Sequence, residues 1–253
     1  MVKVLVTNDD GYNAPGIEVL VKAMKAIGEV TVAAPARNQS ASGHKKALFQ
    51  DIPFERKELF GCPALIVDGS PADCIAVSAL GLSDWPPDIV VSGINRGANM
   101  GQDVTYSGTV TAALEAAIHG AAAVAVSLTS RDGINVEDYE EAGRISQMVV
   151  RKVLEKGLPP LTILNLNLPW GKVKGIRYTR QGIRIYNDLL EVNETGGIAQ
   201  IGGPPPSGMI DEEGTDLWAV HHGYASLTPI HLDLTAHHFM GNIVNWDIDV
   251  NGE

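Results

Sequence analysis

The segment Val2-Lys-Val-Leu-Val-Thr-Asn-Asp-Asp-Gly11 decides how the rest of the chain is interpreted. Its apolar first half, followed by a glycine, predicts a buried strand and the turn that ends it. Asp9 and Asp10 stand at the carboxyl end of that strand, where ligands bind in open α/β sheets. No lysine or arginine follows them before Lys22, so their charges repel, and we expect a hard divalent cation between them. The alternative is that one aspartate caps the turn and the other faces solvent.

The order of the remaining elements predicts a doubly wound, mostly parallel α/β sheet. Further strands are predicted at 29–34, 64–67, 89–92, 122–128 and 162–168, and helices begin near Pro15, Ser70, Ser107 and Asn135. We expect one α/β domain over residues 1–253, with a core at 1–172 that carries the site and an extension at 173–253. The extension loses the strand-helix alternation. It has strand-like pieces at 174–192 and a predicted strand-turn-strand at 217–230 around Gly223. This pattern indicates an antiparallel hairpin used in self-association.

Two polar stretches follow strands of the predicted core. Residues 37–46 read RNQSASGHKK, and residues 93–109 end in Ser107-Gly-Thr109 at the start of a helix. Free N–H groups, the helix dipole and two hydroxyls converge there, which favours binding of an anion. The alternatives are a solvated loop at 37–46 and a simple helix cap at Ser107 or Thr109. A cap explains one hydroxyl, but it explains neither Gly108 nor the polar residues before it.

Composition narrows the classes of partner. The chain has 253 residues, 45% of them hydrophobic, and a formal net charge of −11. Nucleic-acid duplexes and anionic membrane surfaces are therefore not expected partners, because phosphate backbones bind basic patches. The longest apolar stretch, 110–128, contains Glu115 and His119 and predicts a packed helix and strand, not a membrane span. The first strand follows no basic leader, and Cys62 and Cys74 have no metal-binding spacing, so we expect a cytoplasmic protein.

Other chemical motifs are weak or missing. If the pair His221–His222 lies in a strand, its rings point to opposite faces and do not share one metal. A second pair stands at His237–His238. The sequence has no G-x-S-x-G elbow, no Walker A motif and no G-x-G-x-x-G after the first strand, which disfavours serine hydrolases, P-loop NTPases and ordinary dinucleotide binders.

The polar motifs occur together in one known family. Thr7–Gly11, Ala34–Ser40, Ser92–Asn95 and Tyr106–Val110 resemble the SurE (survival protein E) family of metal-dependent 5′-nucleotidases. Matches at 70–74 and within 214–235 extend the resemblance over nearly the whole chain. It implies a Rossmann-like, three-layer αβα core, a C-terminal hairpin exchanged between subunits, and a homodimer or homotetramer.

The resemblance also implies site residues. One divalent cation per subunit, Mg²⁺ or Mn²⁺, would be held by Asp9, Asp10, Ser40 and Asn95. The phosphate would be held by Asn99, Ser107, Gly108 and Thr109. Many relatives have glycine where this chain has Ala41, and small or hydroxyl residues where it has Lys45 and Lys46. These departures concern the lid of the pocket and with it the choice of substrate.

The sequence thus predicts a phosphomonoester hydrolase that acts on nucleoside 5′-monophosphates, and on short polyphosphate as a second substrate class. A water activated by the metal would attack, with Asp9 or Asp10 orienting or deprotonating it. One rival is transfer through an aspartyl intermediate on Asp9, although the chain lacks the D-x-D-x-T spacing of haloacid-dehalogenase-like phosphatases. The other is a nucleotide-binding sensor that has the same pocket and no turnover.

Overall fold

A nine-stranded sheet organises the fold of the computed structural model, which describes residues 1–130 and 132–246. The strands are β1 (Lys3–Thr7), β2 (Glu29–Pro35), β3 (Phe54–Leu59), β4 (Cys62–Val67), β5 (Ile89–Arg96), β6 (Ala123–Leu128), β7 (Thr162–Leu168), β8 (Ile176–Tyr178) and β13 (Ala225–His231). Their order is β3-β4-β2-β1-β5-β6-β7-β13-β8. Only the β3–β4 and β7–β13 pairs are antiparallel. The predicted α/β class with a mostly parallel sheet is confirmed.

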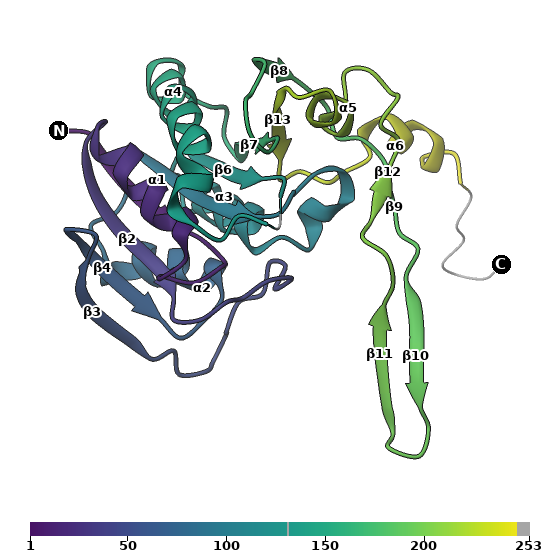
Figure 1. Ribbon diagram of the computed structural model, residues 1–253, viewed down its shortest axis with the longest axis horizontal. Coiled ribbons are helices and arrows are strands. Elements are labelled where there is room, and N and C mark those ends of the chain that lie inside the picture. The colour runs from purple at the N-terminus through teal and green to yellow at the C-terminus, as the bar shows by residue number, and fades with distance from the viewer. Residues whose placement is uncertain (131, 247–253) are drawn as a thin grey trace.

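Helices cover both faces of this sheet and complete three layers (Figure 1). On one face α1 (Pro15–Lys25) packs beside α4 (Glu140–Lys156), and on the other α2 (Pro71–Val77) packs beside α3 (Gly108–Ile118). Each face buries its own apolar cluster, because successive side chains of a strand point to opposite faces. Shorter helical segments are η1 (Ser78–Leu82), η2 (Gly101–Thr105), η3 (Val136–Tyr139), α5 (Asp216–His221) and α6 (His237–Ile243).

Close backbone approaches bring the site loops together. A Cβ at Gly16, in the first turn of α1, would lie 2.0 Å from the carbonyl oxygen of Ile94 in β5. A Cβ at Gly93 would lie 2.3 Å from the carbonyl oxygen of Val126 in β6. Glycine at these positions therefore lets the loop after β1 and the carboxyl end of β5 lie close to their neighbours.

The C-terminal extension does more than form a hairpin. β13 pairs with β7 and with β8, so it lengthens the central sheet. The strands β10 (Leu189–Asn193) and β11 (Ile198–Gly202) form a two-stranded antiparallel arm that projects away from the body, and β9 (Arg184–Ile185) and β12 (Ser207–Gly208) form its base (Figure 1).

One predicted element of the extension is wrong. Residues 216–221 form helix α5, so the expected strand-turn-strand at 217–230 is a helix followed by β13. Thr215 caps the helix, because its hydroxyl accepts a hydrogen bond from the amide of Trp218 at 3.2 Å. His221 and His222 therefore stand at the end of a helix and not in a strand. Among the described residues, no helix is long and apolar enough to cross a membrane.

Candidate active site

Asp9 and Asp10 follow β1, which lies between β2 and β5 in the sheet. Asp9 is 4% exposed. Its Oδ1 accepts a hydrogen bond from the Thr109 hydroxyl at 2.6 Å, and its Oδ2 accepts one from the Thr109 amide at 3.2 Å. Asp10 Oδ2 accepts from the Arg96 amide at 3.0 Å, and its Oδ1 accepts from the Asn38 amide group at 3.4 Å. Both carboxylates are thus held in place by neutral donors from three other segments.

Both aspartates have raised pKa values. Burial and the charge of Asp10 raise the pKa of Asp9 to about 6, despite the hydrogen bonds from Thr109. Burial also raises the pKa of Asp10, although the Arg96 amide and guanidinium oppose that rise. Among the described residues, neither carboxylate forms an ion pair within 4.0 Å. A buried carboxylate next to a half-buried one favours binding of a positive ion.

Ser40 and Asn95 line the same cavity as the aspartates. Ser40 follows β2, and its amide donates to the Asn38 side chain at 2.8 Å. Asn95 is 9% exposed, and its Nδ2 donates to the Gly97 carbonyl at 2.9 Å, which leaves the side-chain oxygen Oδ1 for another partner. The structure therefore brings these two predicted metal ligands to the cavity of Asp9 and Asp10.

The predicted phosphate residues separate into two groups. Asn99 and Ser107 line the cavity. Ser107 also caps α3, since its Oγ accepts from the Val110 amide at 3.1 Å. Thr109 is fully buried and gives both its hydroxyl and its amide to Asp9. Gly108 lies against Asp9, and a Cβ there would come within 2.9 Å of the Asp9 Cβ. In this structure, Thr109 and Gly108 thus position Asp9.

Asparagine residues of β7 fix the loop that carries Asn99. The Asn99 amide donates to the Asn167 side chain at 2.8 Å, and the Asn99 carbonyl accepts from Asn165 and Asn167 at 2.8 and 3.0 Å. The Asn99 side chain donates to the Ser127 hydroxyl at 2.8 Å. The sequence prediction did not include this role for Asn165 and Asn167. The signal was present, because two asparagines at alternate positions are unusual in an otherwise apolar stretch such as 162–168.

The cavity has a volume of about 730 Å³, and the extension supplies one of its walls. The site expected from the sequence lies wholly in residues 1–172 and does not include this wall. The wall residues from the extension are Arg184, Pro205, Pro206, Ile210, Leu217, Val220 and His221. The Arg184 side chain pairs with Asp103 at 2.7 Å, and Tyr186 donates to the same carboxylate at 2.7 Å, which fixes the base of the arm against η2.

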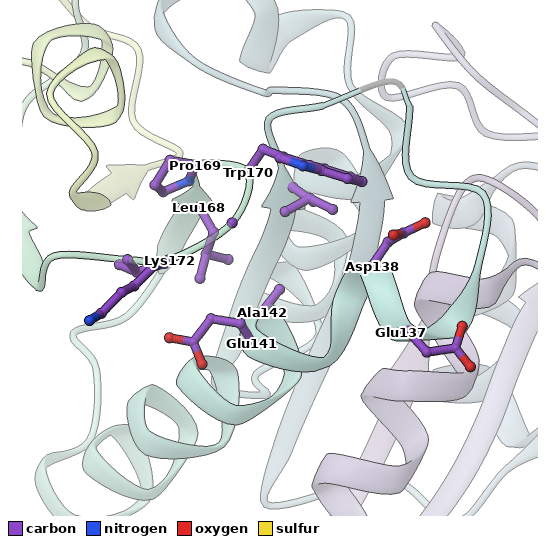
Figure 2. Close-up of a pocket in the computed structure, with 11 residues that line it drawn as sticks. Glu137, Asp138, Glu141, Ala142, Leu168, Pro169, Trp170 and Lys172 are labelled. Carbon is purple, nitrogen blue, oxygen red and sulfur yellow. The ribbon is translucent and has the colours of Figure 1, made fainter.

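A second hollow, of about 440 Å³, lies between the start of α4 and residues 168–173 (Figure 2). Two of its three acidic residues, Asp138 and Glu141, have structural partners. Asp138 accepts from the amides of Ile134 and Asn135 at 3.1 and 2.9 Å, and Glu141 pairs with Arg144 at 2.7 Å. None of the predicted site residues lines this hollow. The predicted site residues that line a cavity therefore line the larger one.

The donor set of the larger cavity suits a hard cation. It offers two carboxylates, a hydroxyl and an amide oxygen, an all-oxygen set that suits Mg²⁺ or Mn²⁺ better than zinc. Within the described part of the chain, no cluster of three or more His, Cys, Asp or Glu residues is placed to hold a metal, so a site built on histidine or cysteine is not supported. His221 is the one histidine among the described residues that line this cavity.

Comparisons with known proteins identify the family of this chain. Residues 4–188 match the family model described as Survival protein SurE. The chain belongs to the SurE family. The protein named 5′-nucleotidase SurE from Chloroflexus aggregans is 45% identical over 255 residues, and the alignment covers 96% of this chain and 98% of the relative. 5′-Nucleotidase SurE 1 from Thermus thermophilus is 45% identical over 244 residues, which cover 94% and 95% of the two chains.

The SurE fold is shared as well. The crystal structure of the SurE protein from Aquifex aeolicus matches with a TM-score of 0.82 at 40% sequence identity, covering 95% of this chain and 98% of that one. The family, the fold class and the relationship to enzymes named 5′-nucleotidases are thus those that the motifs predicted.

Proposed function

We propose that this SurE protein hydrolyses nucleoside 5′-monophosphates in the 730 Å³ cavity and that it acts in the cytoplasm. One observation carries the proposal: Asp9 and the N-terminus of α3 are joined directly, through the hydrogen bonds from Thr109 to Asp9. An acidic site that binds a cation and a helix start that binds an anion therefore lie side by side. Phosphomonoester hydrolysis needs both. The names of the relatives support the same substrate class.

Asp9, Asp10, Ser40 and Asn95 are the proposed ligands of one Mg²⁺ or Mn²⁺ per subunit. When bound, the cation supplies a water of lowered pKa and offsets phosphate charge. Thr109 holds the Asp9 carboxylate at a fixed angle. Asp9 or Asp10 would orient the attacking water or take its proton.

The phosphate would bind where Asn99 and Ser107 face the cavity. The Ser107 hydroxyl accepts from the Val110 amide, so its own hydrogen is available to a phosphate oxygen. The apolar side chains of the extension, together with the exposed ring of Tyr106, offer contact area for a nucleoside. Short polyphosphate would occupy the same phosphate subsite without using that wall.

A panel of phosphate esters tests the substrate class. We expect release of phosphate from 5′-nucleotides with Mn²⁺ or Mg²⁺ present, and slower release from 3′-nucleotides, because only 5′-esters place the base against the extension. Equal rates for 5′-nucleotides, 3′-nucleotides and simple aryl phosphates would contradict a nucleotide-specific site. Nucleotide binding without release from any ester would favour the sensor.

The two serines have different expected effects. Ser107→Ala removes one hydrogen bond to a charged group, which costs about 1.5–3 kcal/mol and lowers kcat/KM about tenfold to hundredfold. It should leave the affinity for Mn²⁺ unchanged. Ser40→Ala should weaken Mn²⁺ binding, and excess Mn²⁺ should restore part of its activity. Calorimetric titration with Mn²⁺ and steady-state kinetics separate the two, and an equal loss of metal affinity in both variants would contradict these roles.

Loss of the helix cap is a separate effect of Ser107→Ala, worth about 0.5–2 kcal/mol of stability. Ser70→Ala is the control for cap loss, because Ser70 caps α2 in the same way and does not line the cavity. It also removes the hydrogen bond from Ser70 to the Lys45 carbonyl in the Ser40 loop, so both variants are assayed with Mn²⁺ saturating. The control should lower the melting temperature as Ser107→Ala does. It should keep near-normal inhibition by inorganic phosphate, which Ser107→Ala should weaken.

The arm β10–β11 is the proposed contact for a homodimer or homotetramer. Leu190 pairs with Ile201, and Val192 with Ala199, so one face of the arm is apolar and exposed. Such a face and two open strand edges favour pairing with another copy. Leu190→Lys with Ile201→Lys should lower the mass measured by light scattering, whereas Glu191→Lys on the opposite face should not. An unchanged mass in the double variant would place the interface elsewhere.

A further inference from the structure

The loop that carries Ser40 has no secondary structure of its own. Residues 36–53 connect β2 to β3 without a helix or strand. Ser40 itself is exposed, and its amide bonds only within the loop, to Asn38. On one side of Ser40, the Gln39 amide donates to the Asp9 carbonyl at 2.7 Å. Contacts further along the loop must hold its other side for the Ser40 hydroxyl to stay near Asp9 and Asp10.

A buried carboxylate lies beneath the far end of this loop. Glu115 is in the last turn of α3, and only 4% of its side chain is exposed. Its Oε1 accepts from Lys46 Nζ at 2.7 Å, and its Oε2 lies 2.9 Å from His44 Nε2. His119, one turn further along α3, lies 3.1 Å from Oε1. Two of these three partners come from the Ser40 loop.

The contacts outweigh the cost of burying the charge. Burial raises the pKa of Glu115, but hydrogen bonds from His44 and Lys46 and the charge of Lys46 lower it to about 2. Glu115 is therefore ionised at neutral pH. A buried carboxylate that loses its cationic partner is destabilised, so the pair with Lys46 holds the loop strongly.

Backbone contacts join the same part of the loop to α2 and α3. The Gly43 amide donates to the Tyr106 carbonyl at 3.0 Å, and the Thr111 hydroxyl donates to the Gly43 carbonyl at 2.8 Å. The Ser70 hydroxyl donates to the Lys45 carbonyl at 2.6 Å. These bonds define where the loop lies on α3, and the half-buried ion pair between Lys46 and Glu115 holds the loop against that helix.

We propose that Glu115 is a positioning residue for the metal site, acting through Lys46 and His44 to hold the Ser40 hydroxyl toward Asp9 and Asp10. This inference rests on the proposed function, because it takes Ser40 as a metal ligand. It also gives a role to Lys46, for which the family resemblance alone suggests none. Without the ion pair, the loop would become ordered only when the metal binds. The entropy lost in ordering it would then lower the affinity of the site for the metal.

The test compares two neighbouring lysines. Lys46→Met removes the charge that meets Glu115 and keeps the aliphatic length. Lys45→Met is the matched control, because among the described residues the Lys45 side chain enters no ion pair. Both lysines are on an exposed loop, so both variants should fold with unchanged circular dichroism. Mn²⁺ affinity is measured calorimetrically on metal-free protein, and the exchange of the Gly43 amide hydrogen is followed by NMR in the absence of metal.

We expect Lys46→Met to weaken Mn²⁺ binding about tenfold, as removal of an outer-shell support typically does, and to speed exchange at Gly43. Lys45→Met should match the wild type in both measurements, and Lys46→Arg should restore most of the affinity. Unchanged Mn²⁺ affinity in Lys46→Met, beside a wild type that binds Mn²⁺, would overturn this inference and leave the proposed function standing. A wild-type protein that binds no Mn²⁺ at all would overturn both.

Discussion

Asp9→Asn should lose at least about a thousandfold in kcat/KM, because metal-ion catalysis supplies several kcal/mol of transition-state stabilisation. The amide keeps the size of the side chain and can still accept from the Thr109 hydroxyl, so the fold should be retained. Phosphate release from AMP and calorimetric titration with Mn²⁺ measure the effect. Asp51→Asn on the exposed loop is the control and should behave as the wild type. Retention of more than a tenth of the activity would contradict the role of Asp9.

The same variant should stabilise the metal-free protein at neutral pH. The pKa of Asp9 is raised from 3.8 to about 6 in the folded state, so its ionisation opposes folding. That cost is absent below about pH 4, grows as the pH rises through 6, and is fully present above it. In EDTA at pH 7, Asp9→Asn should therefore unfold at a higher temperature than the wild type, by an amount worth about 1–3 kcal/mol. The difference should shrink at pH 4.5, and a lower melting temperature at pH 7 would contradict it.

Gly108→Ala should reduce kcat/KM about a hundredfold, because displacing a catalytic group by about 1 Å can lower the rate by that factor. The added Cβ would lie 2.9 Å from the Asp9 Cβ and 2.7 Å from the Ser42 hydroxyl, so Asp9 or the helix start must move. Alanine favours helix over glycine by about 1 kcal/mol, so helix propensity does not explain a loss.

Gly241→Ala is the matched control for this substitution, because Gly241 lies in α6 and a Cβ there meets nothing within 4 Å. The control should keep full activity. Kinetics of both variants, with Mn²⁺ saturating, check the prediction. A fully active Gly108→Ala would show that the contact between α3 and Asp9 does not set the geometry of the site.

The core was predictable because its elements are strongly patterned. Apolar runs ending at Gly11, Pro35 and Gly93 mark strands, and the carboxyl ends of parallel strands meet at one edge of a sheet. The sheet order β2-β1-β5 places the loops that hold Ser40 and Asp9 beside the end of β5, which holds Asn95, as expected. Proximity at this edge follows from topology and needs no knowledge of side-chain packing.

The extension was less predictable because its contacts are long-range. The wall formed by Pro205, Leu217 and His221 depends on where the chain returns after the arm, which no local pattern encodes. The apolar run 217–222 fits a short helix as well as a strand, and the cap at Thr215 was the deciding feature. Strand β3 was not predicted, because its sequence FERKEL is charged and mostly exposed at the edge of the sheet.

The most direct test of the central proposal is the release of phosphate from AMP by one protein sample in three states: as purified, after EDTA, and after EDTA followed by excess Mn²⁺. We predict hydrolysis in the first state, loss of nearly all of it in the second, and recovery in the third, with Asp10→Asn inactive throughout. Hydrolysis that continues undiminished in EDTA, or AMP binding without phosphate release at any Mn²⁺ concentration, would contradict a metal-dependent nucleotidase.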